Sequence, residues 1–312
     1  MSAFASLSVT LLITATTAGA QEPEVPLPPQ AAPEQQSPET ETPEQAVLVW
    51  VAQRSVALET TDPEAETPGE DLAAIGAALE GVRVVGVGEA NRGSSEFFNF
   101  RHRLLRHLVR ELDFRVLAFE SHHAGTPAVN DYIQGGAGTL EQALGGLGLR
   151  IWRVEEMVAM LRWLREHNLE AEPAERVRFV GLDMQGLDRP SAALAAYLTR
   201  VDPERAAAEA AFQAELQAGA ERAWNGDPGA LAGFEAAVDR RLADFALERG
   251  RYVARSSVAE YQRALQDLCV VAQFVRSSAS GRPDARDRFL ADNVLTILAD
   301  EPTAKVVLFA HD

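Results

Sequence analysis

The sequence predicts an α/β fold in which a mostly parallel sheet is flanked by helices. Four apolar runs of strand length each end on a titratable residue, and apolar residues at helical spacing follow the first three runs. Strands that alternate with helices form parallel sheets, whose carboxyl ends share one edge. Ligand sites of α/β proteins form at that edge, so the strand ends predict an enzyme site. The four terminal residues are Glu89, Glu120, Asp183 and His311.

The pattern also predicts the order of the elements. Apolar runs place the strands at 82–88, 114–119, 178–182 and 304–310. Helical spacing places the main helices at 71–81, 94–112, 154–167 and 286–298. Ser94 or Ser95 is expected to cap the second of these helices, and 130–133 to begin a short helix before a glycine pair. Residues 191–275 have an almost entirely helical pattern, which predicts a helical insertion or lid over the strand edge.

The N-terminal part of the chain has the features of an export signal and a spacer. An apolar stretch from Leu7 to Ile13, too short to span a bilayer, leads to an Ala-Gly-Ala cleavage site before Gln21. Residues 1–20 are therefore predicted to be a signal peptide of an exported bacterial protein, in the periplasm, cell envelope or medium. Residues 21–45 hold seven prolines and little apolar bulk, which predicts a disordered linker. The folded domain is expected to span 46–312.

Composition excludes several classes of function. The chain has 312 residues, 46% of them hydrophobic, and a formal charge of −17, whereas non-specific nucleic-acid binding needs a basic surface. Cys269 is the only cysteine, so neither an internal disulfide nor a cysteine zinc site can form. We expect a small-molecule substrate, no cofactor or metal, no nucleic-acid partner and no stable membrane span.

The chemistry-bearing residues favour activation of water by acid–base groups. The sequence has no G-x-S-x-G, H-E-x-x-H or G-x-G-x-x-G motif, which argues against a covalent serine, zincin chemistry and a dinucleotide. Histidine and glutamate can both titrate near neutrality in a cleft. The adjacent His122 and His123 would point to opposite sides of an extended segment, so only one is expected to enter the cleft. Arg153 is a candidate ion-pair partner or substrate clamp.

Several segments together resemble the erythromycin esterase family in order and spacing. They are VGVGEANRGSSEFF, RHRLLRHLVRELDFRVLAFES, NDYIQGG, IWRVEEMVAMLRWLREHN, RVRFVGLDMQ, RDRFLADNV and VVLFAHD, and they cover essentially residues 80–312. The resemblance implies hydrolysis of the macrolactone ring of macrolide antibiotics, and hence antibiotic resistance, without a covalent serine. It implies a site of two glutamates and histidines, one of which activates water. By matching motifs, Glu89, Glu120 and His311 take catalytic places.

The sequence departs from the family pattern at two places. The first family motif usually reads Gly-Glu-x-x-His-Gly, and Arg92 occupies the histidine position here. An arginine stays charged and cannot accept a proton from water. The last motif usually has Asn after its first histidine and a second histidine two residues further on, whereas Asp312 follows His311 and the chain stops. We therefore expect a C-terminally truncated member of the family.

Three hypotheses remain open at this point. The first is an exported hydrolase that acts on a lactone or ester of the macrolide type. In this hypothesis Arg92 impairs the hydrolysis and instead binds an anion or oxyanion. The second is a catalytically silent member that binds a ligand, and the positive charge of Arg92 favours an anionic one. The third is a metal-dependent hydrolase that uses Glu89, His123 and His311. The residues expected to bind substrate or support the site are Asn91, Arg92, His123, Arg153, Asp183 and Arg286.

Overall fold

The computed structural model describes residues 42–65, 70–89, 91–282 and 284–311. The chain divides into two compact units, Met1–Leu58 and Glu59–Asp312. The predicted signal peptide and the predicted linker up to residue 41 lie outside the described residues. In the described part of the first unit, helix α1 (Pro43–Arg54) has a capping box made by Thr42 and Gln45, and none of its residues is buried. The last three residues of the predicted linker are therefore helical.

The second unit contains a sheet of four parallel strands, which confirms the predicted fold class. The strands are β1 (Val84–Val87), β2 (Val116–His122), β3 (Arg178–Asp183) and β4 (Val306–Phe309). Their order in the sheet is β1-β4-β2-β3, so the last strand of the sequence lies between the first two. In the register, Phe309 pairs with both Val87 and Phe119. The chain therefore leaves β1, β4 and β2 at the same level of the sheet.

Helices from both halves of the chain surround the sheet, some of them packed on other helices rather than on the strands. They are α2 (Glu70–Ala78), α3 (Ser95–Leu112), α4 (Thr126–Ile133), α5 (Leu140–Gly146), α6 (Glu155–Glu170) and α12 (Ala285–Asp300), with short 3₁₀ turns η1 (His123–Gly125) and η2 (Arg150–Trp152). Two expectations need correction. The segment 130–133 is the last turn of a helix rather than its start, and the N-cap Ser94 makes no side-chain capping bond. Helix α5 was not predicted, because its glycine-rich sequence carries little periodic signal.

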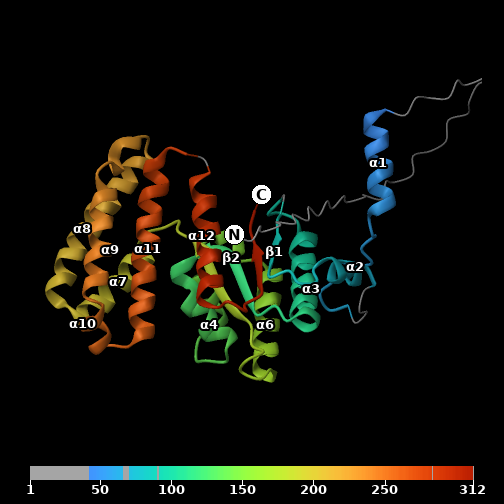
Figure 1. The fold of residues 1–312 in the computed structure, drawn as a ribbon, viewed down its shortest axis with the longest axis horizontal. Coiled ribbons are helices and arrows are strands. Elements are labelled where there is room, and N and C mark those ends of the chain that lie inside the picture. The colour runs from blue at the N-terminus through green and yellow to red at the C-terminus, as the bar shows by residue number, and fades with distance from the viewer. Residues whose placement is uncertain (1–41, 66–69, 90, 283, 312) are drawn as a thin grey trace, which may run out of the picture. The chain divides into compact units, whose positions relative to one another are not determined.

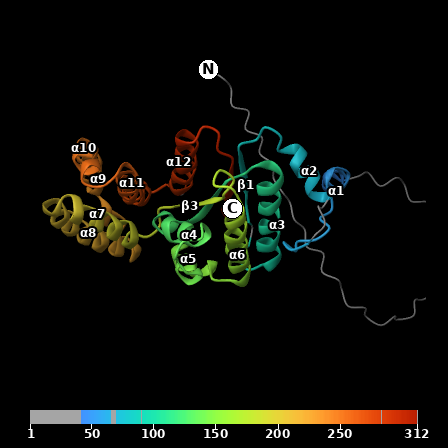
Figure 2. The same ribbon diagram turned by 90° about the horizontal axis from the view of Figure 1, so that it is seen from below.

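The two faces of the sheet pack against different side chains. On one face, Val294 and Ile297 of α12 lie in one buried cluster with Val116, Val180 and Val306 of three strands. The opposite face presents Phe119 to the indole of Trp152, with ring centroids 4.8 Å apart. Figure 1 and Figure 2 both show α12 between the sheet and a separate group of helices in the second unit. Alternate residues of one strand thus serve two separate apolar layers.

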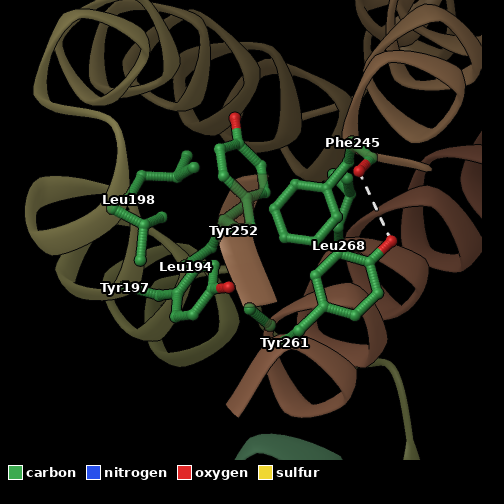
Figure 3. Packing of buried hydrophobic residues seen from close by; sticks show 9 residues of the cluster. Leu194, Tyr197, Leu198, Phe245, Tyr252, Tyr261 and Leu268 are labelled. Atoms are coloured by element: carbon green, nitrogen blue, oxygen red, sulfur yellow. Dashed lines mark hydrogen bonds between the residues drawn. The ribbon is translucent and has the colours of Figure 1, made fainter. Parts of the chain in front are cut away.

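The group of helices beside α12 is the predicted helical insertion. It consists of α7 (Asp188–Val201), α8 (Pro203–Trp224), α9 (Phe234–Leu247), α10 (Arg249–Ala254) and α11 (Val258–Ser280), with a 3₁₀ turn η3 (Pro228–Leu231). An aromatic core holds them together (Figure 3), in which the Tyr261 hydroxyl donates to the Phe245 carbonyl over 3.4 Å. Helices α7 and α11 both contact η1, at the carboxyl end of β2. Their action as a lid stays a prediction. None of the helices in the described ranges is long and apolar enough to cross a membrane.

Candidate active site

Three carboxylates lie at the carboxyl ends of β1, β2 and β3. Glu89 follows β1, Glu120 lies within β2 and Asp183 ends β3. Their exposed fractions are 1%, 3% and 1%, respectively. Buried carboxylates need charged or hydrogen-bonding partners because desolvation of an unpaired charge costs several kcal/mol. Here every one of them faces an arginine.

Arg92 joins two of these carboxylates. Its Nη2 donates to Oε2 of Glu120 over 2.6 Å, and its Nε lies 3.4 Å from Oε1 of Glu89. The guanidinium also lies over the Trp152 ring, 5.2 Å from the ring centroid, an arrangement that favours a cation. Asn91 shapes the turn, since its side-chain oxygen accepts the Gly93 N–H over 2.6 Å. The residue in the family's histidine position is thus an electrostatic bridge between the two glutamates.

Arg101 is a residue of this site that the sequence interpretation missed. It lies in α3 with an exposed fraction of 3%, and its Nη1 forms an ion pair with Oε2 of Glu89. Its guanidinium carbon is 4.4 Å from the ring centroid of Phe309, at the end of β4. The sequence did indicate that Arg101 is buried, because Arg101 falls on the same helical stripe as Phe98 and Leu105. A charge on an apolar stripe indicates a buried partner.

Arg286 joins the third carboxylate, Asp183, to Glu120. At the first turn of α12, its Nε and Nη2 donate to the two oxygens of Asp183 over 3.1 and 2.9 Å. The same Nη2 donates to Oε1 of Glu120 over 2.7 Å. Burial alone would lower the pKa of Arg286, but the two carboxylates outweigh it and raise this pKa. Arg286 therefore stays charged and holds α12 to β2 and β3.

Glu120 is the centre of the network. In addition to Arg286 and Arg92, the backbone N–H of His311 donates to its Oε2 over 2.9 Å. Burial acts to raise the pKa of Glu120, but the donors from Arg286, His311 and Arg92 together hold this pKa below its ordinary value. Glu120 is thus an ionised carboxylate at neutral pH, with both oxygens occupied by donors. Such a group positions a charge better than it removes a proton.

The structure brings together most, but not all, of the predicted site residues. Hydrogen bonds or ion pairs join Glu89, Arg92, Glu120, Asp183, Arg286 and the His311 backbone, and Asn91 shapes the adjoining turn. His123 lies in η1, where its Nδ1 is 2.8 Å from the Gly181 carbonyl oxygen. Arg153 is exposed at the end of η2. Within the described residues, no hydrogen bond joins His123 or Arg153 to the network. The functional roles of all these residues stay predictions.

The arrangement of charges also bears on the metal hypothesis. In the ranges that the structure covers, no three His, Cys, Asp or Glu residues lie together as a metal site. Glu89 is paired with Arg101 and Arg92, and the Nδ1 of His123 is engaged by a backbone carbonyl. The carboxylate oxygens that could bind a metal cation pair with arginines instead. Glu89 and His123 are thus engaged by other partners in this arrangement.

A comparison with protein families decides the membership of the chain. The sequence profile described as "Erythromycin esterase" matches residues 109–312, more than half of the chain. The chain belongs to the erythromycin esterase family. This confirms the resemblance predicted from the sequence motifs. Glu120, Asp183 and Arg286 lie within the matched region, whereas Glu89, Arg92 and Arg101 precede it.

Individual relatives of the erythromycin esterase family show the same similarity. The chain is 30% identical over 135 residues to "Erythromycin esterase type II" of Escherichia coli, which covers 43% of this chain and 31% of that protein. It is 23% identical over 266 residues to "Erythromycin esterase type I" of the same organism, which covers 75% of this chain and 62% of that protein. The chain thus spans less than two thirds of the length of both relatives.

Solved structures share the fold. A crystal structure of a succinoglycan biosynthesis protein aligns with a TM-score of 0.69 at 22% identity, covering 86% of this chain and 66% of that chain. A mutant of the erythromycin esterase EreC in its open conformation aligns with a TM-score of 0.63 at 18% identity, covering 80% of this chain and 65% of that chain. At these identities the likeness establishes the α/β fold alone.

Proposed function

We propose that the chain is a hydrolase of the erythromycin esterase family that cleaves a carboxylic ester or lactone with activated water. One observation carries this proposal: Glu89 and Glu120, the two glutamates to which the resemblance assigns catalytic places, lie at one sheet edge and are joined by Arg92. A charged cluster at this edge of a parallel sheet is a typical position for a catalytic site. The relatives named erythromycin esterase make a macrolide the first substrate to test.

Arg92 limits what this site does with a macrolide. The three carboxylates are balanced by the three arginines Arg92, Arg101 and Arg286, so none of the acids is left as an unpaired base. An arginine cannot replace a histidine that takes a proton from water. General-base catalysis contributes about 10²–10⁴-fold to rates. We therefore expect macrolide ring opening by this chain to be slower by a factor of that order than by a member with histidine at this position.

The test is mass spectrometry of erythromycin incubated with the purified protein. Ring opening adds one water to the antibiotic, which the mass change detects directly. The variant Arg92→His should increase the yield of opened product, because a neutral imidazole between Glu89 and Glu120 can accept a proton. Arg276→His serves as a matched control, since Arg276 pairs with Asp239 on the exposed surface of α11. No product from either wild type or R92H, with folding verified by circular dichroism, contradicts the macrolide esterase function.

A ligand-binding function is the second candidate, and the bridging contact of Arg92 favours it. A cation that pairs with Glu89 and Glu120 and stacks on Trp152 stabilises the site without catalysing a reaction. Its charge is compensated by the glutamates, so the earlier expectation of an anionic ligand loses its basis. Thermal-shift measurements with intact macrolides distinguish the candidates. Stabilisation without turnover supports binding, and turnover supports the hydrolase.

Export is proposed from the N-terminal sequence alone. Expression of the full chain in a bacterium, followed by fractionation, tests it. The expected result is a shortened protein outside the cytoplasm that begins near Gln21. A full-length protein that stays in the cytoplasm contradicts export.

A further inference from the structure

We propose that His122 is the base that accepts the proton of the attacking water in this chain, at a centre it forms with Arg189. This inference rests on the proposed hydrolase function and assigns a proton acceptor that Arg92 cannot provide. His122 lies at the carboxyl end of β2, two residues beyond Glu120, and its side chain is half-buried. The sequence interpretation had placed His123 in the site instead.

A local irregularity of the sheet directs the His122 side chain. The pairing of β2 with β3 shifts its register between Phe119 and His122, and His122 then pairs with Asp183. Register shifts of this kind re-aim side chains and are common beside active sites. They also break the simple alternation of side chains along a strand. The orientation of His122 and His123 therefore could not follow from their adjacency.

Two glycines hold the imidazole of His122 between two loops. Gly148 and Gly186 have φ values of +88° and +90°, a region that favours glycine. A Cβ on Gly148 would lie 2.4 Å from Cγ of His122, and a Cβ on Gly186 would lie 2.9 Å from its Cε1. Each position thus requires glycine for its backbone and for its contact with the ring. Such a fitted slot fixes the ring orientation, which proton transfer requires.

Charged groups from two elements act electrostatically on the His122 ring. They are Asp183 at the end of β3 and Asp188 and Arg189 at the start of α7. Burial is the main cause that lowers the pKa of His122; Asp183 and Asp188 oppose this effect and Arg189 adds to it. The imidazole is therefore neutral at pH 7 and has a nitrogen lone pair available as a proton acceptor.

A groove with room for a ligand lies beside Arg189. It has a volume of about 350 Å³ and lies between α4 and α5, with Gly145, Gly146 and Arg189 along its wall. This volume is within the range of small-molecule sites. Arg189 also donates to the Gly146 carbonyl over 3.3 Å, and it follows three residues after Gly186, whose backbone packs on the His122 ring. The groove and the ring are thus connected through the segment that carries Arg189.

These groups suffice for a balanced hydrolysis. A nitrogen of His122 takes a proton from water while the water oxygen forms a bond to the carbonyl carbon of an ester. The carbonyl oxygen becomes an oxyanion, which the Arg189 guanidinium stabilises. The tetrahedral intermediate then breaks its bond to the alcohol oxygen, and the proton on His122 passes to that oxygen. The products are a carboxylic acid and an alcohol, and the imidazole is neutral again.

The experiment measures hydrolysis of 4-nitrophenyl acetate by the full chain as a function of pH. We compare wild type, His122→Asn and the control His167→Asn. His167 lies in the last turn of α6, stacked on Trp163. Wild type and H167N should show an acid limb of kcat/KM below pH 6.5, whereas H122N should lose about 10²–10⁴-fold in kcat/KM and lack that limb. NMR titration of the His122 ring, assigned from its absence in H122N, should give the same midpoint as the acid limb.

The outcomes separate this inference from the function on which it rests. If wild type hydrolyses an ester and H122N keeps both the rate and the acid limb, the assignment of His122 is wrong while the hydrolase function stands. The same holds if the His122 ring titrates at a pH different from the acid limb. If wild type hydrolyses neither 4-nitrophenyl acetate nor a macrolide, the hydrolase function is wrong and the assignment of His122 is wrong with it.

Discussion

Arg101 carries a buried charge that neutralises the buried carboxylate of Glu89. It pairs with Glu89 and lies over the rings of Phe309 and Phe119, while its Nε and Nη2 have no hydrogen-bond partner among the described residues. The variant Arg101→Met keeps most of the side-chain volume but removes the cation from the buried carboxylate. We expect a loss of about 3–5 kcal/mol in the free energy of unfolding, as for other broken buried pairs. Urea denaturation measures it.

An exposed pair provides the control for Arg101. Arg276 and Asp239 form an ion pair on the surface of α11 and α9, where water screens the interaction. Arg276→Met should change the free energy of unfolding by only about 0–1 kcal/mol. Equal changes in the free energy of unfolding for the two substitutions would show that the buried Glu89–Arg101 pair stabilises the fold no more than an exposed pair.

His102 makes the stability of the chain depend on pH. It is buried in α3 beside Trp163. Within the part of the chain that the structure describes, neither ring nitrogen has a hydrogen-bond partner. Burial lowers the pKa of His102 to about 3. Between this value and the ordinary 6.5, the unfolded chain binds a proton that the folded chain does not. Stability therefore falls as the pH falls from 6.5 to 3, by up to about 1.4 kcal/mol per pH unit from this residue.

The variant His102→Phe isolates this contribution, since phenylalanine keeps the aromatic contact and cannot titrate. Urea midpoints of both proteins at several pH values between 4 and 7 should show a shallower pH dependence for H102F. The other lowered histidine pKa values, for example that of His107, act equally on both proteins. Parallel pH curves would mean that His102 is already accessible to protons in the folded state.

At the residue scale, the sequence predicts the three acids and two of the three arginines, Arg92 and Arg286, but neither Arg101 nor the pairing of the arginines with the acids. Glu89, Glu120 and Asp183 were found because each closes an apolar run at the functional edge of the sheet. Their partners Arg92, Arg101 and Arg286 lie in a turn and in two helices, where arginine usually faces solvent. Ion pairing across 103 residues, as between Arg286 and Asp183, leaves no local pattern in the sequence.

At the scale of elements, helix α12 connects the charged network to the helical group. Its first turn carries Arg286, and two turns later Asn293 donates to the Leu182 carbonyl over 2.8 Å and exchanges hydrogen bonds with Gln273 of α11. Asn293 is 5% exposed. This amide therefore fixes α12 against β3 and α11 at the point where water is excluded.

Asn293→Ala should loosen this connection. The substitution leaves the Gln273 amide and the Leu182 carbonyl buried without their partner, which costs about 1–3 kcal/mol for each unsatisfied group. Urea denaturation should show the loss, and hydrogen exchange should show faster exchange in α12. The control is Asn99→Ala in α3, whose side-chain amide donates to the Ser95 hydroxyl over 3.3 Å. An N293A protein as stable as N99A would contradict this role of α12.

The positions of the strands in the sequence were easier to predict than their order in the sheet. Apolar runs located all four strands, because buried parallel strands read as continuous apolar segments. The order of the strands was not predictable in the same way. β4 is inserted between β1 and β2 from more than 180 residues further along the chain, and no spacing records such a pairing. The side chains at the site meet because of this insertion, which places the His311 backbone against Glu120.

At the scale of the whole molecule, a buried ion pair near the N-terminal end of the second unit stabilises that unit. Asp71 accepts two hydrogen bonds from Arg103, over 2.7 and 2.9 Å, and one from the Glu59 N–H over 3.0 Å. Arg103 also donates to the Thr60 carbonyl over 2.9 Å. Both charged groups are buried. The first residues of this unit are thus fixed by contacts within the unit itself.

A chain shortened to residues 59–312 should therefore keep its stability. It retains the Asp71–Arg103 pair, and it loses α1, none of whose residues is buried. We expect the same midpoint of thermal unfolding as for the full chain. A chain shortened to 73–312 removes Asp71 and leaves Arg103 buried without its partner, which should lower the free energy of unfolding by about 3–5 kcal/mol. Differential scanning calorimetry of the three chains measures both effects. A lower midpoint for 59–312 would show that the first unit stabilises the second, and equal midpoints for all three would remove the Asp71–Arg103 pair from the account.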